Sequence, residues 1–294
     1  MIAKIYRNIV PIGIRASIAD WKKKKENRKV LKKIKGGGYP YQTECEYMLK
    51  KGAIYTMPYP WIEKYRNDNV KVYFDFKRKM PYCQIDNESK KIYFPRRWNK
   101  KYIQRYYNSI ICEQDPKSPH YYFDKEDVWF DKNTVFVDVG AAEGFISLQI
   151  IDKVKRVILL ECDVNWIRPL KATFEKWQDK VTIVSKCAGE MNDGNTCRVD
   201  TFIDDETEKI AVKMDVEGTE MSVIKGCRKL RDIDQVRAYI CLYHNDKDEE
   251  KIAPFLKNMG FTTTTSDTYM FYKFTGEKEY SFRHGVLKCE KNKI

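Results

Sequence analysis

Two acids stand in a loop whose other residues are small. The stretch VFVDVGAAEGFIS (135–147) places Asp138 and Glu143 around a turn bounded by Gly140 and Gly144, and it holds no lysine or arginine. Loops that bind phosphate normally follow the dinucleotide pattern GxGxxG or end in Gly-Lys-Ser/Thr. Neither pattern is present, and a carboxylate at the helix entrance would repel a phosphate. The alternative is a structural role, in which both acids only cap the helix N-terminus.

The charge of this loop fits S-adenosylmethionine, which has no phosphate and carries a sulfonium and an ammonium at its reactive end. Acids beside the turn would attract both cations. Glu161 ends the next apolar run, 21 residues after Gly140. At about this spacing an acid meets the ribose hydroxyls of a nucleoside. Glu161 therefore predicts a nucleoside ligand without identifying it, and the acidic loop favours S-adenosylmethionine over NAD or ATP.

Three more ionisable groups follow later apolar runs. Asp215 and Glu217 come after KIAVKM, and His244 comes after VRAYICLY. Methyl transfer from a sulfonium is an in-line displacement, which needs an aligned acceptor and a group that removes its proton. We expect His244 or Asp215 to be the general base and Glu217 to orient the acceptor or the cofactor's ammonium. A divalent ion held by all three is the less favoured variant, and Glu217 could instead cap the following helix.

Alternating strands and helices must position these groups. From residue 134 the expected strands are TVFVDV, RVILLE, KVTIVS, KIAVKMD and VRAYICLY, and the expected helices are GFISLQIIDKV, NWIRPLKATFEKWQ capped by Asn165, TEMSVIKGCRKL and DEEKIAPFLKNMG. Such alternation predicts right-handed crossovers and a parallel sheet, whose carboxyl edge collects the loops. FTTTT and YMFYKF then read as two strands around a tight turn. The sequence predicts an α/β, Rossmann-like fold with a mostly parallel seven-stranded sheet and an antiparallel terminal hairpin.

The chain before residue 134 does not show this alternation of strands and helices. VKVYFDF and KKIYFP read as strands of a short meander, and KKYIQRYYNSIICEQ reads as a helix. GGG at 36–38 is typical of a flexible joint. We therefore expect a basic amphipathic arm with a glycine hinge at 1–38, an α+β accessory region at 39–127 and the methyltransferase domain at 128–294.

The net charge of +13 is concentrated in the arm, because residues 1–35 hold twelve basic residues against two acids. Ile14, Ile18 and Trp21 share one helical face there, downstream of Pro11, which suits contact with an anionic membrane. Docking of these residues on the protein's own core is the alternative. Because the sequence shows neither a membrane span nor a signal peptide, and its nine cysteines form no CxxC pair, we expect a reduced, cytoplasmic protein, with the arm at the inner face of the cell membrane.

The motifs DVGAAEG, LLECD, KMDVEGTEMSVIKG and LYHNDKD together resemble the FkbM-type methyltransferases, a branch of the Rossmann-like S-adenosylmethionine enzymes. The resemblance covers roughly residues 130 to 275. It implies that the glycine-rich loop lines the methionine end, that Glu161 binds the ribose, and that Cys187 and Ala188 border the adenine. Ala142 departs from the glycine common at its position. The expected cofactor-binding residues are Asp138, Gly140, Ala142, Glu143, Gly144, Glu161, Cys187, Ala188 and Asp215.

Segments outside these motifs, ICEQDPKSPHYYF, YFPRRW and FRHGVL, resemble a subgroup associated with bacterial surface-glycan gene clusters. They imply an O-methyltransferase acting on a sugar hydroxyl of a surface glycan or of its nucleotide- or lipid-linked precursor. We expect His120, Tyr121 and Glu217 to contact this carbohydrate acceptor, although His120 could instead pin its own loop. The alternatives are an RNA methyltransferase, which only the basic arm favours, and a cofactor-binding module without catalysis.

Overall fold

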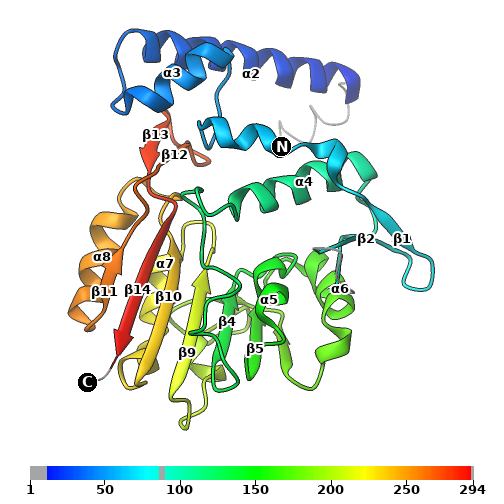
Figure 1. The fold of residues 1–294 in the computed structure, drawn as a ribbon, viewed down its shortest axis with the longest axis vertical. Helices are drawn as coiled ribbons and strands as arrows, with labels where there is room; N and C mark the ends of the chain where they lie inside the picture. The colour runs from blue at the N-terminus through cyan, green and yellow to red at the C-terminus, as the bar shows by residue number, and fades with distance from the viewer. Residues whose placement is uncertain (1–11, 86–89, 293–294) are drawn as a thin grey trace. The chain divides into compact units, whose positions relative to one another are not determined.

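The computed structural model describes the backbone of residues 12–85 and 90–292, and side chains from residue 24 onward (Figure 1). The chain divides into two compact units. The first comprises Met1–Ile62 and Phe271–Ser281, and the second comprises Glu63–Met270 and Phe282–Ile294. The division expected from the sequence, at residues 38 and 127, concerns functional domains and stays a prediction.

Within the first unit, helix α2 (Ile12–Lys35) contacts helix α3 (Gln42–Lys51). The glycine stretch after α2 closes this helix, because the Gly36 and Gly38 N–H groups donate to carbonyls in its last turn. Val30 and Ile34 of α2 are buried. The side chains of Ile14, Ile18 and Trp21, which carry the membrane hypothesis, lie outside the described residues, as does Pro11. No helix in the described part of the chain is long and apolar enough to cross a membrane.

The second unit contains a seven-stranded sheet with the order β11-β14-β10-β9-β4-β5-β6 (Figure 1). Its strands are β4 (Val135–Val139), β5 (Arg156–Leu160), β6 (Val181–Val184), β9 (Lys209–Met214), β10 (Gln235–Cys241), β11 (Thr262–Thr264) and β14 (Val286–Asn292). The pairs β4–β5, β4–β9, β5–β6 and β9–β10 are parallel, whereas β14 is antiparallel to both of its neighbours. The α/β, Rossmann-like fold and its one reversed strand are therefore confirmed.

The reversed strand is not the one predicted. YMFYKF contains β12 (Met270–Tyr272), which pairs with β13 (Ser281–Arg283) in a separate two-stranded sheet. The strand inserted between β10 and β11 is β14, whose register runs from Cys241 opposite Val286 to Gln235 opposite Asn292. Lysine and glutamate alternate with buried residues along β14. Because of this polar alternation, the sequence did not predict a strand at β14. The apolar run at 269–274 was predicted as the terminal strand instead.

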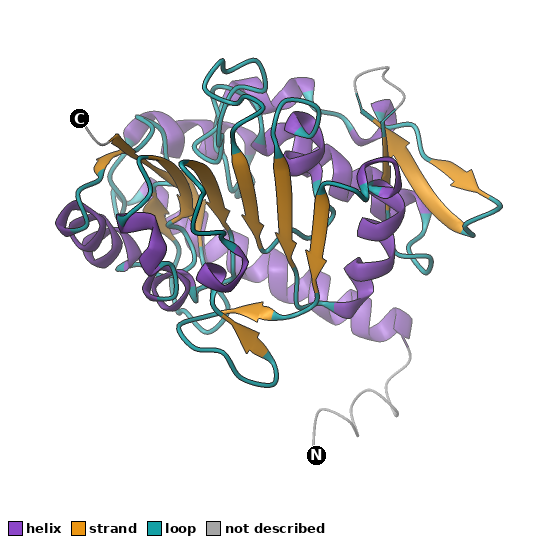
Figure 2. Cartoon of the chain, turned by 90° about the horizontal axis from the view of Figure 1, so that it is seen from below, coloured by secondary structure: helices purple, strands orange, loops and turns teal. Residues whose placement is uncertain are grey.

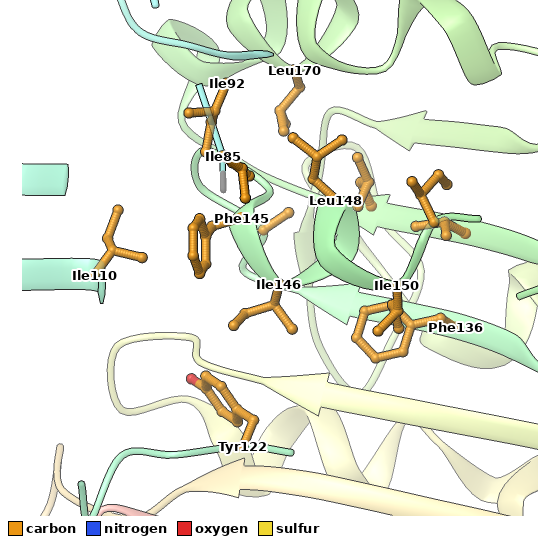
Figure 3. Close-up of a cluster of buried hydrophobic side chains, with 14 of the residues drawn as sticks. Ile85, Ile92, Ile110, Tyr122, Phe136, Phe145, Ile146, Leu148, Ile150 and Leu170 are labelled. Carbon is orange, nitrogen blue, oxygen red and sulfur yellow. The ribbon is translucent and has the colours of Figure 1, made fainter. Parts of the chain in front are cut away.

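Helices lie on both faces of this sheet (Figure 2). These helices are α5 (Phe145–Ile150), α6 (Val164–Thr173), α7 (Glu220–Lys225) and α8 (Asp248–Asn258). Helix α4 (Lys100–Glu113) lies across the carboxyl ends of the strands (Figure 1). Along β4, Phe136 belongs to one buried cluster and Val135 and Val137 belong to the other. Alternate side chains of a strand point to opposite faces, so each face carries its own core. Figure 3 shows Phe136, Leu148 and Ile150 within the first cluster.

Two helix details differ from expectation. The N-cap of α6 is Asp163, whose carboxylate accepts the Asn165 N–H, so Asn165 is not the cap. Helix α5 ends at Ile150, whereas the sequence predicted a helix through Val154. Both differences follow from weak local signals, because two capping residues lie only two positions apart at 163 and 165 and the residues from Ile151 onward form turns.

The segment before β4 forms a meander of β1 (Tyr73–Asp75), β2 (Met80–Gln84) and β3 (Lys91–Tyr93), followed by α4. The Asn99 side chain accepts the Tyr102 N–H and caps α4. Ile103 and Ile110 of this helix are buried in the cluster that contains Phe136. Helix α4 is thereby fixed to the sheet, and the residues of its remaining faces line two cavities.

Candidate active site

A cavity of about 1030 Å³ lies at the carboxyl ends of β4, β5 and β9. Each of these three strands delivers acids to its wall, namely Asp138 and Glu143, Glu161 and Asp163, and Asp215 and Glu217. Helix α4 closes another side with residues that include Tyr106 and Glu113. The wall therefore brings together most of the residues expected from the sequence, and it adds residues of α4 that the sequence did not indicate.

The glycines of the loop between β4 and α5 are required by its geometry. Gly140 has φ of 75°, and a Cβ there would lie 1.9 Å from the carbonyl oxygen of Asp215. Gly144 has φ of 77°, and its Cβ would lie 2.7 Å from the ring of Phe174. Ala142 adopts φ of 45°, a conformation that L-residues rarely take. The loop is thus held in close contact with the end of β9.

A lysine that the sequence argument overlooked faces the acidic loop. Lys213 of β9 is buried, and its Nζ lies 3.0 Å from Asp138 Oδ1 and donates to the Gly140 carbonyl at 2.6 Å. Burial lowers the pKa of Lys213, but the charges of Asp138 and Asp215 raise it above its ordinary value overall. Because Asp138 also accepts from Ser147 Oγ at 2.7 Å, its charge is compensated within the protein. Asp138 holds the loop in place, and the attraction for a cation must come from other acids.

Glu143 supplies such an acid. It is buried, lines the cavity and accepts a 2.7 Å hydrogen bond from the Tyr106 hydroxyl. Burial raises its pKa to about 7, although the Tyr106 hydrogen bond opposes the rise. Helix α5 has Gly144 as its N-cap and no side-chain cap hydrogen bond among the described residues. The capping alternative for Glu143 therefore has no support, and its carboxylate faces the cavity.

The carboxylate of Glu161 is oriented by two backbone groups. The Ala142 N–H donates to Oε2 at 2.7 Å, and the Asp163 N–H donates to Oε1 at 2.6 Å. A carboxylate has about four acceptor sites, so each oxygen keeps capacity for one more donor, as the two hydroxyls of a ribose provide. Cys187 and Ala188 form the short strand β7 and line the same cavity. These groups fit a nucleoside.

Asp215 stands at the centre of a polar cluster. The Tyr122 hydroxyl lies 3.2 Å from Oδ2 and the Tyr243 hydroxyl 3.4 Å from Oδ1. His120 Nε2 is 3.7 Å from Oδ2, and His244 Nε2 is 3.5 Å from Oδ1. Burial would raise the pKa of Asp215, but nearby Lys213 and the two histidines lower it below its ordinary value overall. Asp215 is thus held ionised at the wall of the cavity.

His244 lies behind Asp215. Its side chain is fully buried, is absent from the cavity wall, and places Nδ1 2.7 Å from Glu220 Oε1. Burial lowers the pKa of His244, but the hydrogen bond with Glu220 and the charge of Asp215 raise it overall. His244 is therefore placed to support Asp215, whereas direct contact with an acceptor would require the side chain to reach the cavity.

Glu217 is placed differently from a helix cap. Its side chain is 77% exposed, its φ is 53°, and Oε2 lies 3.5 Å from His244 Nε2. Glu220 instead accepts the N–H groups of Val216 and Gly218 at the start of α7. Because Glu217 lines the cavity, it is available to an acceptor or to the cofactor's ammonium.

The loop with His120 joins the same cluster. His120 is buried in the cavity wall, and burial lowers its pKa to about 4, so its imidazole is neutral. Nearby Glu113 of α4 has its pKa raised to about 8 by burial and by the charges of Asp215 and Glu143. Tyr121, which was expected to contact the acceptor, does not line the cavity, and Lys288 lies over its ring. The neighbouring residue, Tyr122, lines the cavity instead.

The described residues also contain two groups of side chains of the kind that hold metal ions. Asp215 occurs in both, once with Glu220 and His244, and once with His120 and Cys241. In the second group the Tyr122 hydroxyl already lies 3.2–3.5 Å from all three partners. In the first, Glu220 Oε1 lies 2.7 Å from His244 Nδ1. Glu217, the third ligand of the less favoured metal variant, has Oε2 3.5 Å from His244 Nε2 but belongs to neither group. This arrangement suits a divalent ion only moderately.

Comparison with known proteins agrees with this geometry. The family model described as Methyltransferase FkbM domain matches residues 192–263, which include Asp215, Glu217 and His244. A search among curated proteins found no match.

Several solved structures are similar. One is methyltransferase FkbM from Methylobacillus flagellatus KT, with 18% identity over 65% of this chain and 53% of that chain and a TM-score of 0.43. Another is precorrin-6y C5,15-methyltransferase from Geobacter metallireducens GS-15, with 15% identity over 55% and 82% and a TM-score of 0.38. A third is a SAM-dependent O-methyltransferase from Thermotoga maritima, with 12% identity over 56% and 62% and a TM-score of 0.36. The match thus spans about half the length of the Methylobacillus protein.

Because these TM-scores are low, the fold is assigned from the strand order of this chain. That order, the geometry of the loop after β4 and the family match agree with one another. The chain thus has an α/β, Rossmann-like fold, and its residues 192–263 are similar to the methyltransferase FkbM domain.

Proposed function

We propose that the protein transfers the methyl group of S-adenosylmethionine to a hydroxyl of a sugar, in a surface glycan or in its nucleotide- or lipid-linked precursor. The observation that carries this proposal is the continuity of one cavity, which runs from Glu161 to the cluster around Asp215. Its volume of about 1030 Å³ is at the upper end of ligand pockets, which span roughly 300–1,000 Å³. There is room for a nucleoside cofactor and for part of an acceptor.

The chemistry of the wall supports an acceptor rich in hydroxyl groups. Beyond the loop, the cavity is lined by the carboxylates of Asp215 and Glu217, and by Glu113, whose pKa of about 8 favours its protonated form at neutral pH. An ionised carboxylate only accepts hydrogen bonds, so this end suits a ligand that donates several O–H groups. The same charge would repel the phosphates of RNA, which disfavours the RNA methyltransferase alternative at this site.

When bound, S-adenosylmethionine supplies an electrophilic methyl group on a cationic sulfur. Glu143 and Glu161 hold the cofactor's charged end and its ribose. Asp215, kept ionised, accepts the hydroxyl proton of the acceptor, and Glu217 orients the acceptor's neighbouring hydroxyls. His244 acts as a positioning residue, because Nε2 lies 3.5 Å from Asp215 Oδ1 and Nδ1 is fixed by Glu220.

The basic arm supports a cytoplasmic protein that contacts the inner face of the cell membrane. Residues 1–35 carry most of the net positive charge, and each basic residue near an anionic membrane contributes about 1 kcal/mol. Deletion of residues 1–35 should abolish sedimentation with liposomes that contain anionic lipid. Unchanged sedimentation would refute this role of the arm.

The transfer itself is tested with S-adenosylmethionine labelled in its methyl group. The full chain is incubated with glycan and RNA fractions from cells that lack the gene, and label is followed in each fraction. Incorporation into the glycan fraction, lost on Asp215→Asn, is the expected result. Label in RNA alone would favour the RNA methyltransferase, and absence of cofactor binding by the folded protein would refute methyl transfer altogether.

A further inference from the structure

A second cavity adjoins the first across helix α4. Its volume is about 640 Å³, and it shares Gln114 and Phe145 with the wall of the first cavity. Tyr107, Asn108 and Ile111 of α4 line the second cavity, whereas the first cavity is lined by Tyr106, Ser109, Ile110 and Glu113. Because residues three and four apart share a helix face, the two cavities use neighbouring faces of one helix.

The second cavity is basic. Lys64, Arg66 and Lys71 line it, and Asp115 is the single acid among the described residues of its wall. Asp115 is buried and already engaged, because Lys64 Nζ lies 2.5 Å from Oδ2 and the Tyr65 hydroxyl donates to the same oxygen at 2.6 Å. Two cationic side chains therefore remain to face a ligand.

These two side chains are only lightly committed to other groups. Arg66 pairs with Asp68 at 3.3 Å, but both side chains are about two-thirds exposed, and such surface pairs contribute little. Lys71 is exposed and makes no ion pair with any residue that the structure describes. An anionic group of a ligand can thus meet Arg66 and Lys71 without breaking a strong internal interaction.

The rest of the wall is made of amides and aromatic rings. Asn69, Gln84, Asn108, Gln114 and Gln149 supply the amides, and Tyr65, Tyr73 and Tyr107 supply the rings. Asn108 and Gln149 are half-buried, and their side chains make no hydrogen bond to another described residue. An amide donates and accepts at once, which matches neighbouring hydroxyl groups on a sugar. An aromatic face suits the apolar face of a sugar ring.

We propose that the second cavity binds an anionic sugar unit of the acceptor, one that carries a carboxylate or a phosphate. This inference rests on the proposed function for the statement that the bound saccharide is the methyl acceptor. The anionic unit lies against Arg66 and Lys71, and an adjoining sugar presents its hydroxyl to Asp215 in the first cavity. The opposite charges of the two cavities fix the direction in which the chain of sugars lies.

Single-stranded nucleic acid is the competing ligand, since phosphate and aromatic rings would suit it as well. Binding sites for single strands follow the backbone with a continuous positive groove. Here three basic side chains are confined to one cavity, and the adjoining cavity is acidic. The saccharide is therefore the ligand that the two cavities favour together.

The test uses the full chain saturated with S-adenosylhomocysteine and follows ligand binding by NMR of the ligand. The probes are glucuronate, glucose 1-phosphate and glucose, and a single-stranded RNA oligonucleotide serves as a competitor. We expect at least one anionic probe to bind clearly better than glucose, and whichever of the two binds identifies the anionic group. Arg66→Gln with Lys71→Gln should weaken this binding about tenfold, since two charge-assisted hydrogen bonds are lost.

A matched control removes the same charge elsewhere. Lys171 and Lys257 are exposed and line neither cavity, so Lys171→Gln with Lys257→Gln should leave probe binding unchanged. Both double variants should bind S-adenosylhomocysteine as the unchanged chain does. Equal weakening in the control, equal binding of glucose, or displacement of the anionic sugar by RNA at lower concentration would overturn the inference. Binding of S-adenosylhomocysteine without binding of any sugar probe would also overturn the inference. That result would leave the proposed methyl transfer itself uncontradicted.

Discussion

The two cavities on neighbouring faces of α4 have opposite chemistry. The first gathers acids at the carboxyl ends of β4, β5 and β9, and the second gathers Lys64, Arg66 and Lys71 beside the meander. Four charged groups of the first, Asp138, Glu143, Glu161 and Lys213, are buried and fixed by named partners, as Asp138 is by Lys213. The basic side chains of the second are exposed. One helix thus separates a cavity suited to a cation from a cavity suited to an anion.

This difference teaches where substitutions should matter. A buried charge that loses its partner is costly, whereas an exposed charge contributes little to stability. We expect changes in the first cavity to affect folding, cofactor binding and methyl transfer. Changes in the second should affect only the acceptor.

The largest effect is expected at the ion pair that holds the cofactor loop. Lys213→Met leaves the buried Asp138 carboxylate without its partner, which typically costs about 3–5 kcal/mol of unfolding free energy. Chemical denaturation measures this loss. The double variant Lys213→Met with Asp138→Asn should recover much of it, and a single variant as stable as the unchanged chain would show that the pair does not hold the loop.

Asp215 should dominate the transfer rate. Removal of a positioned base costs typically 10²- to 10⁴-fold, so Asp215→Asn should lower kcat by about that factor with cofactor binding retained. His244→Ala should cost less, because His244 acts through Asp215. Single-turnover transfer at saturating acceptor compares the two. An unchanged rate in Asp215→Asn would remove this residue as the base, and a larger loss in His244→Ala would return that role to His244.

Gly140→Ala should abolish tight cofactor binding while leaving most of the fold. The new Cβ would lie 1.9 Å from the Asp215 carbonyl, and φ of 75° disfavours alanine by roughly 1–2 kcal/mol. Calorimetric titration with S-adenosylhomocysteine measures the loss. Gly194→Ala is the matched control, because a Cβ there would meet nothing within 4 Å, and equal binding in both variants would contradict the required close approach.

A smaller effect is expected from pH. Burial raises the pKa of Glu143 to about 7, so its carboxylate becomes charged, and attracts the cationic cofactor, as pH rises through 7. Affinity for S-adenosylmethionine should increase roughly tenfold between pH 6 and 7.5. Because the folded pKa lies above the ordinary value, the same residue favours folding most below about pH 4.5 and less as pH rises through 7. Glu143→Gln should flatten the affinity profile, and a flat profile in the unchanged chain would contradict this role.

The sequence predicted the fold because its strands from residue 134 are apolar and regularly spaced. It also placed Glu161, Asp215 and Glu217 at one edge, since parallel strands end together. It missed the partners that set their charges. Lys213 is a single lysine within an apolar strand, and Glu113 is a single acid at the end of a helix. Neither residue by itself indicates a cavity.

The two histidines show the same limit. Both follow elements that point toward the site, yet only the structure shows that His120 lines the cavity and that His244 lies behind Asp215. Side-chain depth depends on packing between segments far apart in the chain, here between residues 120, 215 and 244. No periodicity in the sequence reports such depth.

The most direct test of the account is calorimetric titration of the full chain with S-adenosylmethionine, beside the variant Glu161→Ala. One molecule should bind per chain, and Glu161→Ala should weaken binding by about tenfold or more, because the ribose loses its charge-assisted hydrogen bonds. A folded protein that does not bind the cofactor, or that binds it equally well without the Glu161 carboxylate, would contradict the assignment of the acidic cavity.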